Sequence, residues 1–357
     1  MIDGTFLSNE DLVGFLEEKD PVKVKELLTT AYSIKVDNVG NKVYLRGLIE
    51  LSNICIKNCY YCGLRKANSN VSRYELSEKQ ILDAALFAWK ANYGSLVLQA
   101  GERTGVRYIK KVTKLIKSIK DLSNGELGIT LSLGEQSKEV YQEWFDAGAH
   151  RYLLRIESSN PDLYNKIHPN NLLHSWDRRV AALINIKEIG YQTGTGVMIG
   201  LPYQTSQDLA NDLLFMKEIG CHMVGMGPYL RHSETPLGEL IHDNQGLELT
   251  LKMVALLRIL MPKINIAATT AMQVIDPEGR EKAVFAGANV IMPNMTISEV
   301  RKDYQIYENK PGIEDDGAIS KSKLEENLAK NGIEIGWSEW GDSKAFLGTL
   351  PNLKKKS

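Results

Sequence analysis

The stretch Cys55-Ile56-Lys57-Asn58-Cys59-Tyr60-Tyr61-Cys62 contains three of the four cysteines in this 357-residue chain. Three thiols so close together in one loop are typical of metal ligands. A structural zinc site would need a fourth cysteine or histidine nearby, and none follows within the usual spacing. An iron–sulfur cube held by three cysteines, in contrast, keeps one iron free to bind a small molecule. The stretch therefore predicts a reactive iron–sulfur site, with buried thiols or a disulfide pair plus one spare thiol as the alternative.

The sequence around this stretch alternates between short β-rich runs and helical stretches. Helix-start patterns such as Ser77-Glu78-Lys79-Gln80 and Thr205-Ser206-Gln207-Asp208 separate the runs. Repeated β–α units predict a parallel sheet, and eight of them predict closure into a (β/α)8 barrel of the TIM type, an α/β fold. The eight predicted strands cover residues 43–51, 95–99, 127–133, 151–156, 193–199, 222–227, 264–269 and 288–292.

The rest of the chain adds segments at both ends of this barrel. Ser8 and Asp11 fit a capping box, and Asp20-Pro21 is a favourable helix start, so the sequence predicts two helices before residue 40. We therefore expect an N-terminal helical lid (residues 1–40), a barrel domain (41–295) and a C-terminal extension packed on the barrel (296–357).

The composition is that of a globular protein with a net charge of -1, from 43 basic and 44 acidic residues. This balance gives no reason to expect nucleic acid or an anionic membrane as a partner. No hydrophobic run is long enough to span a membrane. Four cysteines without a disulfide framework favour a reducing compartment, so we expect a cytoplasmic protein.

The cysteine spacing, with Tyr61 directly before the last cysteine, resembles the signature of the radical S-adenosylmethionine (SAM) superfamily. The resemblance implies that Cys55, Cys59 and Cys62 hold a 4Fe-4S cluster and that SAM binds its open iron through the amino and carboxylate groups. It also implies that one electron from the cluster breaks a carbon–sulfur bond of SAM, giving methionine and a 5′-deoxyadenosyl radical. Tyr61 joins the expected cofactor-binding residues on the same ground.

Charged residues near the predicted strand ends are candidate contacts for SAM. Glu102 can accept N–H donors from the SAM ammonium group, while the preceding Gly101 leaves room for the ligand. The position is similar to the Gly-Gly-Glu-Pro element of radical SAM enzymes, although Ala100 and Arg103 depart from it. Arg179 can bind the SAM carboxylate with its two-pronged guanidinium, the alternative being a surface arginine on a helix.

Arg155 and Glu157 lie two residues apart at the end of the fourth predicted strand, so their side chains point the same way. A charged pair that enters a barrel is costly unless it binds a ligand or pairs internally. We interpret Glu157 as a ribose or SAM contact and Arg155 as a group that faces an anion. A purely structural ion pair is the alternative.

Hydroxyl groups stand at the ends of two other predicted strands. Thr130 and Ser132 share one face of the third strand, and Thr269 and Thr270 close the seventh. Hydroxyls can line a cavity without bringing charge, which suits a polar substrate; singly, each can equally be a satisfied structural group. We place Ser132 with the cofactor-binding residues and expect Met198 to form an apolar wall beside the adenine.

A more specific resemblance extends across the whole predicted barrel, to the HydE family of radical SAM maturases of FeFe-hydrogenase. Seven runs of sequence carry it, at residues 49–53, 58–65, 130–135, 151–155, 198–202, 268–272 and 289–294. The resemblance implies that Glu157 and Arg179 contact SAM. It also implies a substrate cavity lined by Thr130, Arg155, Thr269, Thr270, Met292 and Tyr304.

The HydE resemblance implies a role in assembling the diiron centre of the hydrogenase. The implied substrate is a small organometallic molecule, an iron–cysteine complex carrying carbonyl and cyanide. The implied partners are the other hydrogenase maturases and a flavodoxin- or ferredoxin-type reductant. Some HydE proteins carry a second set of cysteines near the carboxyl terminus, but no cysteine follows Cys221 here, so we expect a single cluster.

Two other classes of function stay open at this point. One is a related radical SAM enzyme that acts on an amino-acid-like substrate, such as a methylornithine synthase, or a sulfur inserter similar to biotin synthase. The missing cysteines count against biotin synthase, which needs an additional cluster as its sulfur source. The other class is a noncatalytic iron–sulfur carrier. A carrier should not cleave SAM, so an anaerobic cleavage assay separates it from an enzyme.

Overall fold

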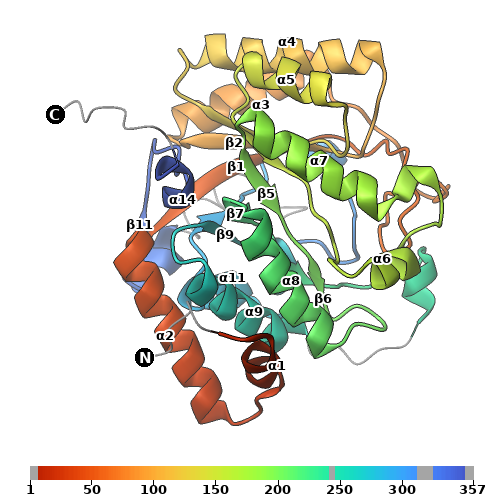
Figure 1. Cartoon of the computed structure of the whole chain (residues 1–357). Helices are drawn as coiled ribbons and strands as arrows, with labels where there is room; N and C mark the ends of the chain where they lie inside the picture. The colour runs from red at the N-terminus through yellow and green to blue at the C-terminus, as the bar shows by residue number, and fades with distance from the viewer. Residues whose placement is uncertain (1–6, 241–245, 312–324, 350–357) are drawn as a thin grey trace.

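The computed structural model describes residues 7–240, 246–311 and 325–349, and its centre is a closed ring of parallel strands (Figure 1). Neighbouring strands pair in sequence order, and β10 pairs with β1 through Tyr44 and Val290, which closes the ring. The predicted (β/α)8 barrel is thus confirmed. The eight strands of the ring are β1 (Lys42–Ser52), β2 (Ser95–Ala100), β3 (Gly128–Ser132), β4 (Arg151–Leu153), β5 (Gln192–Thr195), β7 (Met223–Val224), β9 (Asn265–Ala268) and β10 (Val290–Ile291).

Two of the predicted strands are each divided in two. The run 193–199 forms β5 and β6 (Met198–Ile199), and the run 222–227 forms β7 and β8 (Gly227–Pro228). Both breaks occur where the two backbones approach each other at Gly196 and Gly225. A Cβ atom on Gly196 would lie 2.0 Å from the Gly225 carbonyl oxygen, so only glycine fits there. Beyond the breaks, β6 and β8 pair with each other in parallel.

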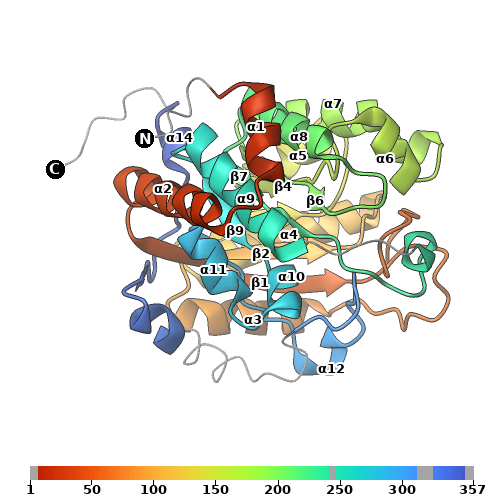
Figure 2. The same cartoon turned by 90° about the horizontal axis from the view of Figure 1, so that it is seen from below.

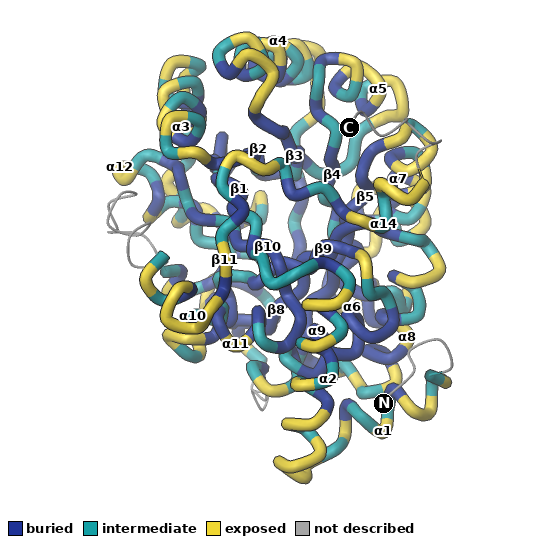
Figure 3. The backbone as a smooth tube through the Cα atoms, turned by 90° about the vertical axis from the view of Figure 1, so that its left-hand side faces the viewer, coloured by how far each residue is buried: buried dark blue, intermediate teal, exposed yellow. Residues whose placement is uncertain are grey.

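Helices form a second layer around the strands, and their outward faces are the exposed parts of the molecule (Figures 2 and 3). In α4 the buried residues Val112, Leu115, Ile116 and Ile119 recur with helical spacing and give the helix one apolar face toward the barrel. The outer layer comprises α3 (Glu78–Lys90), α4 (Val106–Leu122), α5 (Lys138–Asp146), α7 (Trp176–Ile189), α8 (Ser206–Ile219), α9 (Gly246–Leu260) and α11 (Gly279–Phe285). Shorter segments are α6 (Pro161–Ile167), α10 (Thr270–Ile275), α12 (Ser298–Arg301) and the 3-10 turns η1 (Leu172–His174) and η2 (Pro236–Glu239).

The predicted helix starts agree with the observed caps. Ser77 and Gln80 form a reciprocal capping box at the start of α3, and Thr205 and Asp208 do the same for α8. These caps confirm two starts that the sequence indicated. None of the helices that the structure describes is both long and apolar enough to cross a bilayer.

The N-terminal helices α1 (Asn9–Glu17) and α2 (Pro21–Val39) begin at the predicted caps. They pack on the outer helices, α1 against α8 and α2 against α9, so the segment predicted as a lid lies along the side of the barrel (Figure 2). The buried Lys252 of α9 donates a hydrogen bond to the Leu16 carbonyl oxygen at 3.3 Å. The contact ties α1 to the outer layer.

The C-terminal extension reaches both ends of the barrel. After β10 the chain crosses the carboxyl ends of the strands, and residues 312–324 and 350–357 of the predicted extension lie outside the described residues. Later, β11 (Glu334–Ile335) pairs with the start of β1, and α14 (Lys344–Leu347) follows (Figure 1, dark blue). Residues 336–343, called the plug below, lie between them.

The plug provides partners for charged groups inside the amino end of the barrel. Arg46 and Arg151 are buried there, and Arg46 donates to the Gly341 carbonyl oxygen at 3.2 Å. Arg151 forms an ion pair with Asp342, whose carboxylate also accepts from Gln192 Nε2 at 2.7 Å. Buried guanidinium groups need such partners, so the plug closes this end of the barrel.

Candidate active site

The three clustered cysteines lie in the loop between β1 and α3, at the carboxyl ends of the strands. All three are free thiols; Cys59 is buried, while Cys55 and Cys62 are partly buried. We call residues 53–63 the cysteine loop. In barrels of this type the reacting groups gather at this face, so the loop lies where chemistry is expected.

Hydrogen bonds from three directions hold the cysteine loop. The Ile56 amide donates to the Glu102 carbonyl oxygen at 2.9 Å, and the Tyr60 amide donates to that of Ile167 at 3.0 Å. The Gly63 amide donates to the Ile306 carbonyl oxygen at 3.1 Å. At Gly101, an added Cβ would lie 2.5 Å from the Ile54 carbonyl oxygen, so glycine allows the end of β2 to approach the loop.

Burial and mutual proximity raise the pKa values of the cysteine thiols. Burial raises the pKa of Cys59 to about 12, and the neighbouring Cys55 contributes to the rise. Burial also raises the pKa of Cys62, and again the other two thiols add to it. Three thiolates so close together are unstable without a cation that replaces their protons, which is the condition for metal binding.

The donor set fits an iron–sulfur cluster. Within the part of the chain that the structure describes, no three Cys, His, Asp or Glu side chains surround a position for a single metal ion. Three free cysteines in one loop instead match a cluster that leaves one iron without a protein ligand.

Four charged side chains lie beside the cysteine loop: Lys57, Glu102, Glu135 and Arg179, called the charged quartet below. Glu135 is partly buried, and the other three are buried. Lys57 Nζ lies 3.2 Å from a Glu102 oxygen and 3.1 Å from a Glu135 oxygen. Arg179 Nε lies 3.0 Å from Glu135, whereas its Nη1 lies 3.8 Å from Glu102. Burial raises the pKa of Glu102, although the charges of Arg179 and Lys57 oppose the rise. The Arg179–Glu102 contact is the longest of the four.

Arg155 and Glu157 lie beyond the end of β4, which is shorter than predicted, and they form an ion pair at 2.9 Å. Arg155 Nη2 also donates to the Val197 carbonyl oxygen at 2.8 Å. Glu157 has a φ of 65°, a left-handed conformation that strains a residue with a side chain. Burial raises the pKa of Glu157, while the charges of Arg155 and Arg179 lower it. A strained, buried carboxylate in a barrel mouth is typical of a functional position.

The predicted hydroxyl residues lie on the inner surface of the barrel or at its mouth. Thr130 Oγ1 is buried without a hydrogen-bond partner among the described residues, beside a small cavity of about 20 Å³ that Met292 also lines. Ser132 is partly buried at the end of β3. Thr269 Oγ1 donates to the Met226 carbonyl oxygen at 3.3 Å, and the Thr270 hydroxyl lies 2.9 Å from the Tyr307 hydroxyl.

Tyr304 reaches the same region from the segment that follows β10. Its hydroxyl accepts a hydrogen bond from Gln99 Nε2 at 3.2 Å. Burial raises the pKa of Tyr304, and the charges of Glu50 and Cys62 add to the rise. The Gly63 amide donates to the Ile306 carbonyl oxygen, so the segment that carries Tyr304 lies beside the cysteine loop.

Tyr61 and Met198 meet in an apolar cluster at the edge of the loop. Met198 packs with Leu201 and Tyr229 in the buried part of this cluster, and Tyr61 packs against it. The Tyr61 hydroxyl lies 3.2 Å from Nε2 of the buried His168. Apolar walls with few polar groups are typical of sites for flat heteroaromatic ligands.

The structure thus brings most of the predicted residues to the carboxyl face of the barrel, whereas Thr130 and Met292 line a small cavity inside it together with Arg46. It also adds residues that the sequence did not single out. Lys57 and Glu135 complete the charged quartet, and both stand in stretches already noted, the cysteine stretch and the end of the third strand. Glu50 also stands in a noted stretch, residues 49–53, but His168 and Lys310 had no such signal, because the partners of their side chains are remote in sequence.

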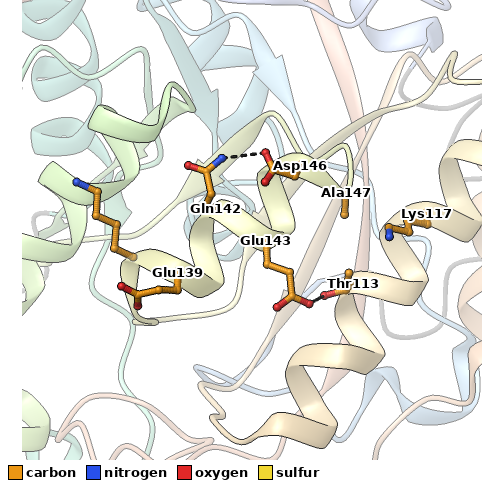
Figure 4. Close-up of a pocket in the computed structure, with 8 residues that line it drawn as sticks. Thr113, Lys117, Glu139, Gln142, Glu143, Asp146 and Ala147 are labelled. Atoms are coloured by element: carbon orange, nitrogen blue, oxygen red, sulfur yellow. Dashed lines mark hydrogen bonds between the residues drawn. The ribbon is translucent and has the colours of Figure 1, made fainter.

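A large surface hollow lies elsewhere, between α4 and α5 (Figure 4). It has a volume of about 650 Å³, and in it Glu143 and Thr113 are joined by a hydrogen bond of 2.5 Å. None of the residues discussed above lines it. The hollow belongs to the outer helical layer and takes no part in the candidate site.

Similarities to known proteins agree with this geometry. Residues 49–216 match the Radical SAM superfamily. The chain is 46% identical over 286 residues to the FeFe-hydrogenase maturase subunit HydE of Thermotoga maritima, covering 80% of this chain and 79% of that protein. It is 27% identical over 293 residues to 3-methylornithine synthase of Methanosarcina acetivorans, covering 82% and 80%. The crystal structure of methylornithine synthase (PylB) matches 93% of this chain and 95% of its own with a TM-score of 0.80 at 22% identity, which shows the fold alone.

Proposed function

Since this chain belongs to the radical SAM superfamily and, within it, to the HydE-type maturases of FeFe-hydrogenase, we propose that its substrate is an iron–cysteine complex carrying carbonyl and cyanide. The observation that supports this most is the joint placement of three free thiols, the charged quartet and Arg155 at one barrel mouth. The product would be a precursor of the diiron centre of the hydrogenase.

Cys55, Cys59 and Cys62 would hold one 4Fe-4S cluster, and we propose no second one because no cysteine follows Cys221. When bound, the cluster supplies the electron that splits SAM into methionine and a 5′-deoxyadenosyl radical. The residues around it have other tasks: they bind SAM, orient it and exclude water.

The charged quartet suits the amino-acid end of SAM, which carries one positive and one negative group. Glu102 would accept from the ammonium group and Arg179 would donate to the carboxylate. The Glu102–Arg179 contact, at 3.8 Å, is the longest in the quartet. Replacing it with contacts to the ammonium and carboxylate groups of SAM would therefore cost less free energy than breaking any other contact of the quartet. Lys57 and Glu135 would remain as their partners and hold both in place.

The nucleoside end of SAM would lie toward the apolar cluster. Tyr61 and Met198 offer an apolar surface for the adenine, and Glu157 offers a carboxylate for the ribose hydroxyls. Ser132 would add a hydroxyl at the neighbouring strand end. The strained backbone at Glu157 fixes the direction of its carboxylate before the ligand arrives.

The substrate would occupy the barrel below SAM. Arg155 supplies a positive charge for an anionic, cyanide-bearing complex, and Thr130 offers a hydroxyl without a partner among the described residues. Thr269, Thr270 and Tyr304 would add further hydroxyls, and Met292 an apolar floor. We place the reaction in the cytoplasm, with other hydrogenase maturases and a flavodoxin- or ferredoxin-type reductant as partners.

Complementation tests this proposal. In cells that lack HydE but retain the other maturases, the chain should restore hydrogenase activity, and the Cys59→Ser variant should not. A protein that carries its cluster and cleaves SAM, yet leaves the hydrogenase inactive, would contradict the proposal. Saturable binding of lysine by that same protein would instead favour the amino-acid rearrangement of the methylornithine synthases.

A further inference from the structure

A strap of eight residues, 303–310, crosses the carboxyl face of the barrel beside the cysteine loop. Asn53 Nδ2 donates to the Asp303 carbonyl oxygen at 2.7 Å, and the Gly63 amide donates to that of Ile306 at 3.1 Å. Further along, the Glu308 amide donates to the Arg231 carbonyl oxygen at 3.3 Å. The strap therefore contacts both sides of the barrel mouth.

Two tyrosines of the strap point into the mouth. The Tyr304 hydroxyl accepts from Gln99 of β2, and the Tyr307 hydroxyl contacts Thr270, which follows β9, so the two tyrosines reach different strands of the ring. Their exposed fractions are 2% and 8%. The strap forms one wall of the proposed substrate cavity.

The end of the strap is fixed by an ion pair inside the protein. Lys310 Nζ contacts Glu50 Oε1 of β1, and the side chains are 7% and 1% exposed. The same ammonium group donates to the Tyr304 carbonyl oxygen at 3.1 Å and lies 4.8 Å from the centre of the Tyr304 ring. The Glu50 side chain is itself held, since its Oε2 accepts from Asn294 Nδ2 at 3.1 Å.

Such a pair is a poor way to gain stability, because an apolar pair of the same size often does as well or better. What it adds is geometry: the lysine joins the inside of β1 to the backbone of Tyr304, residues separated by most of the chain. We propose that Lys310 is a positioning residue that, through Glu50, holds the strap closed and so places Tyr304 and Tyr307 against the substrate. The proposal rests on the proposed function only for the identity of the cavity's occupant.

Limited proteolysis with chymotrypsin, which cuts after tyrosine, measures the strap directly and needs no hydrogenase. In Lys310→Met the native protein should be cut after Tyr304 and Tyr307 at least about tenfold faster than wild type, because cleavage follows the population of the open form. Glu50→Gln, nearly the same shape as glutamate, should act alike, and the double variant should be no worse than either single one. Lys302→Met, which alters an exposed lysine just before the strap, is the matched control.

Two further measurements distinguish a role of Lys310 in positioning the strap from a role in stabilising the whole barrel mouth. Cluster content and SAM affinity of Lys310→Met should stay within about twofold of wild type, since neither ligand set includes the lysine, while the yield of matured hydrogenase falls about tenfold. A wild-type cleavage rate in both Lys310→Met and Glu50→Gln would overturn the proposal. Equal loss of cluster and of strap protection would overturn it as well, because the pair would then support the whole mouth.

Discussion

Cys59 is the buried member of the cysteine trio, whereas Cys55 and Cys62 are partly buried. We expect Cys59→Ser to abolish cluster binding, because a hydroxyl is a poor iron ligand compared with a thiolate. Iron content and visible absorption after anaerobic reconstitution provide the measurement. Cys221→Ser is the control, since Cys221 is also buried but its thiol donates to the Met216 carbonyl oxygen, away from the cysteine loop. A loaded cluster in Cys59→Ser would contradict the ligand assignment.

Arg179 offers a second test at the same scale. Arg179→Lys keeps the positive charge but loses the planar fork, so SAM affinity should fall about 10- to 100-fold, the range of one or two charge-assisted hydrogen bonds. Equilibrium binding of SAM to cluster-loaded protein measures the effect. Arg178→Lys changes the exposed neighbour and should leave the affinity unchanged. Equal affinities for both variants would exclude Arg179 from the SAM site.

Single residues differ in how far the sequence reveals them. The cysteine spacing alone predicted the cluster ligands, and Gly101 pointed to Glu102, but the expected roles of these residues stay predictions. Lys57 was visible in the cysteine stretch, yet nothing local indicates that its ammonium group lies between two carboxylates. Such roles depend on partners that only the folded barrel brings together.

Among the elements, α3 follows directly on the segment that carries the cysteine loop, and its start depends on a capping box. Ser77→Ala should lower the free energy of unfolding by about 1 kcal/mol, because the Gln80 amide loses its acceptor. Urea denaturation of the apoprotein measures it. Ser33→Ala, on the exposed face of α2, should cost little or nothing. An equally stable Ser77→Ala variant would mean that packing alone fixes the start of α3.

The ends of the strands could not be predicted from the sequence. Apolar runs predicted all eight strands of the ring, but the break between β5 and β6 comes from the close approach of Gly196 and Gly225. In β4 the strand ends at Leu153, although the Leu154 amide still donates to the Gly194 carbonyl oxygen at 2.9 Å. The local sequence indicates that a segment tends to be extended, whereas contacts with the adjacent strands determine where regular hydrogen bonding ends.

At the scale of the molecule, the plug joins the C-terminal extension to the inside of the barrel. Asp342→Asn should destabilise the protein by about 3 kcal/mol, because Arg151 is left buried beside a neutral group. Denaturant unfolding measures the loss. Asp83→Asn breaks an exposed helical pair with Lys79 instead, and should change stability by at most about 0.5 kcal/mol.

The effect of Asp342→Asn on stability should depend on pH. Burial alone would raise the pKa of Asp342, but its hydrogen bond with His150 and the charge of Arg151 outweigh burial and hold the pKa below its usual 3.8. A carboxylate with a lowered pKa stabilises the fold at pH values above 3.8 and loses that contribution as the pH falls toward its folded value. The stability difference between wild type and Asp342→Asn should therefore be largest near neutrality and shrink in acid. A difference that grows in acid would contradict the ion pair.

The regular β–α alternation made the closed barrel predictable, because repeated units of this kind build a parallel sheet and eight of them are the number that closes a TIM-type barrel. The plug was not predictable in the same way. Residues 336–343 carry no motif. Asp342 acquires its role only because it pairs with the buried Arg151, which lies nearly two hundred residues earlier in the chain. A packed extension was expected there, but not its place at the amino end of the barrel.

The plug also sets an order on biosynthesis. Translation delivers β1, with Arg46, long before it delivers Gly341, so until residues 336–343 emerge the two buried arginines at the amino end of the barrel lack these partners. Emergence of the eighth strand from the ribosome therefore does not complete the fold. The pairing of Arg46 and Arg151 waits until residues 336–343 have been synthesised as well.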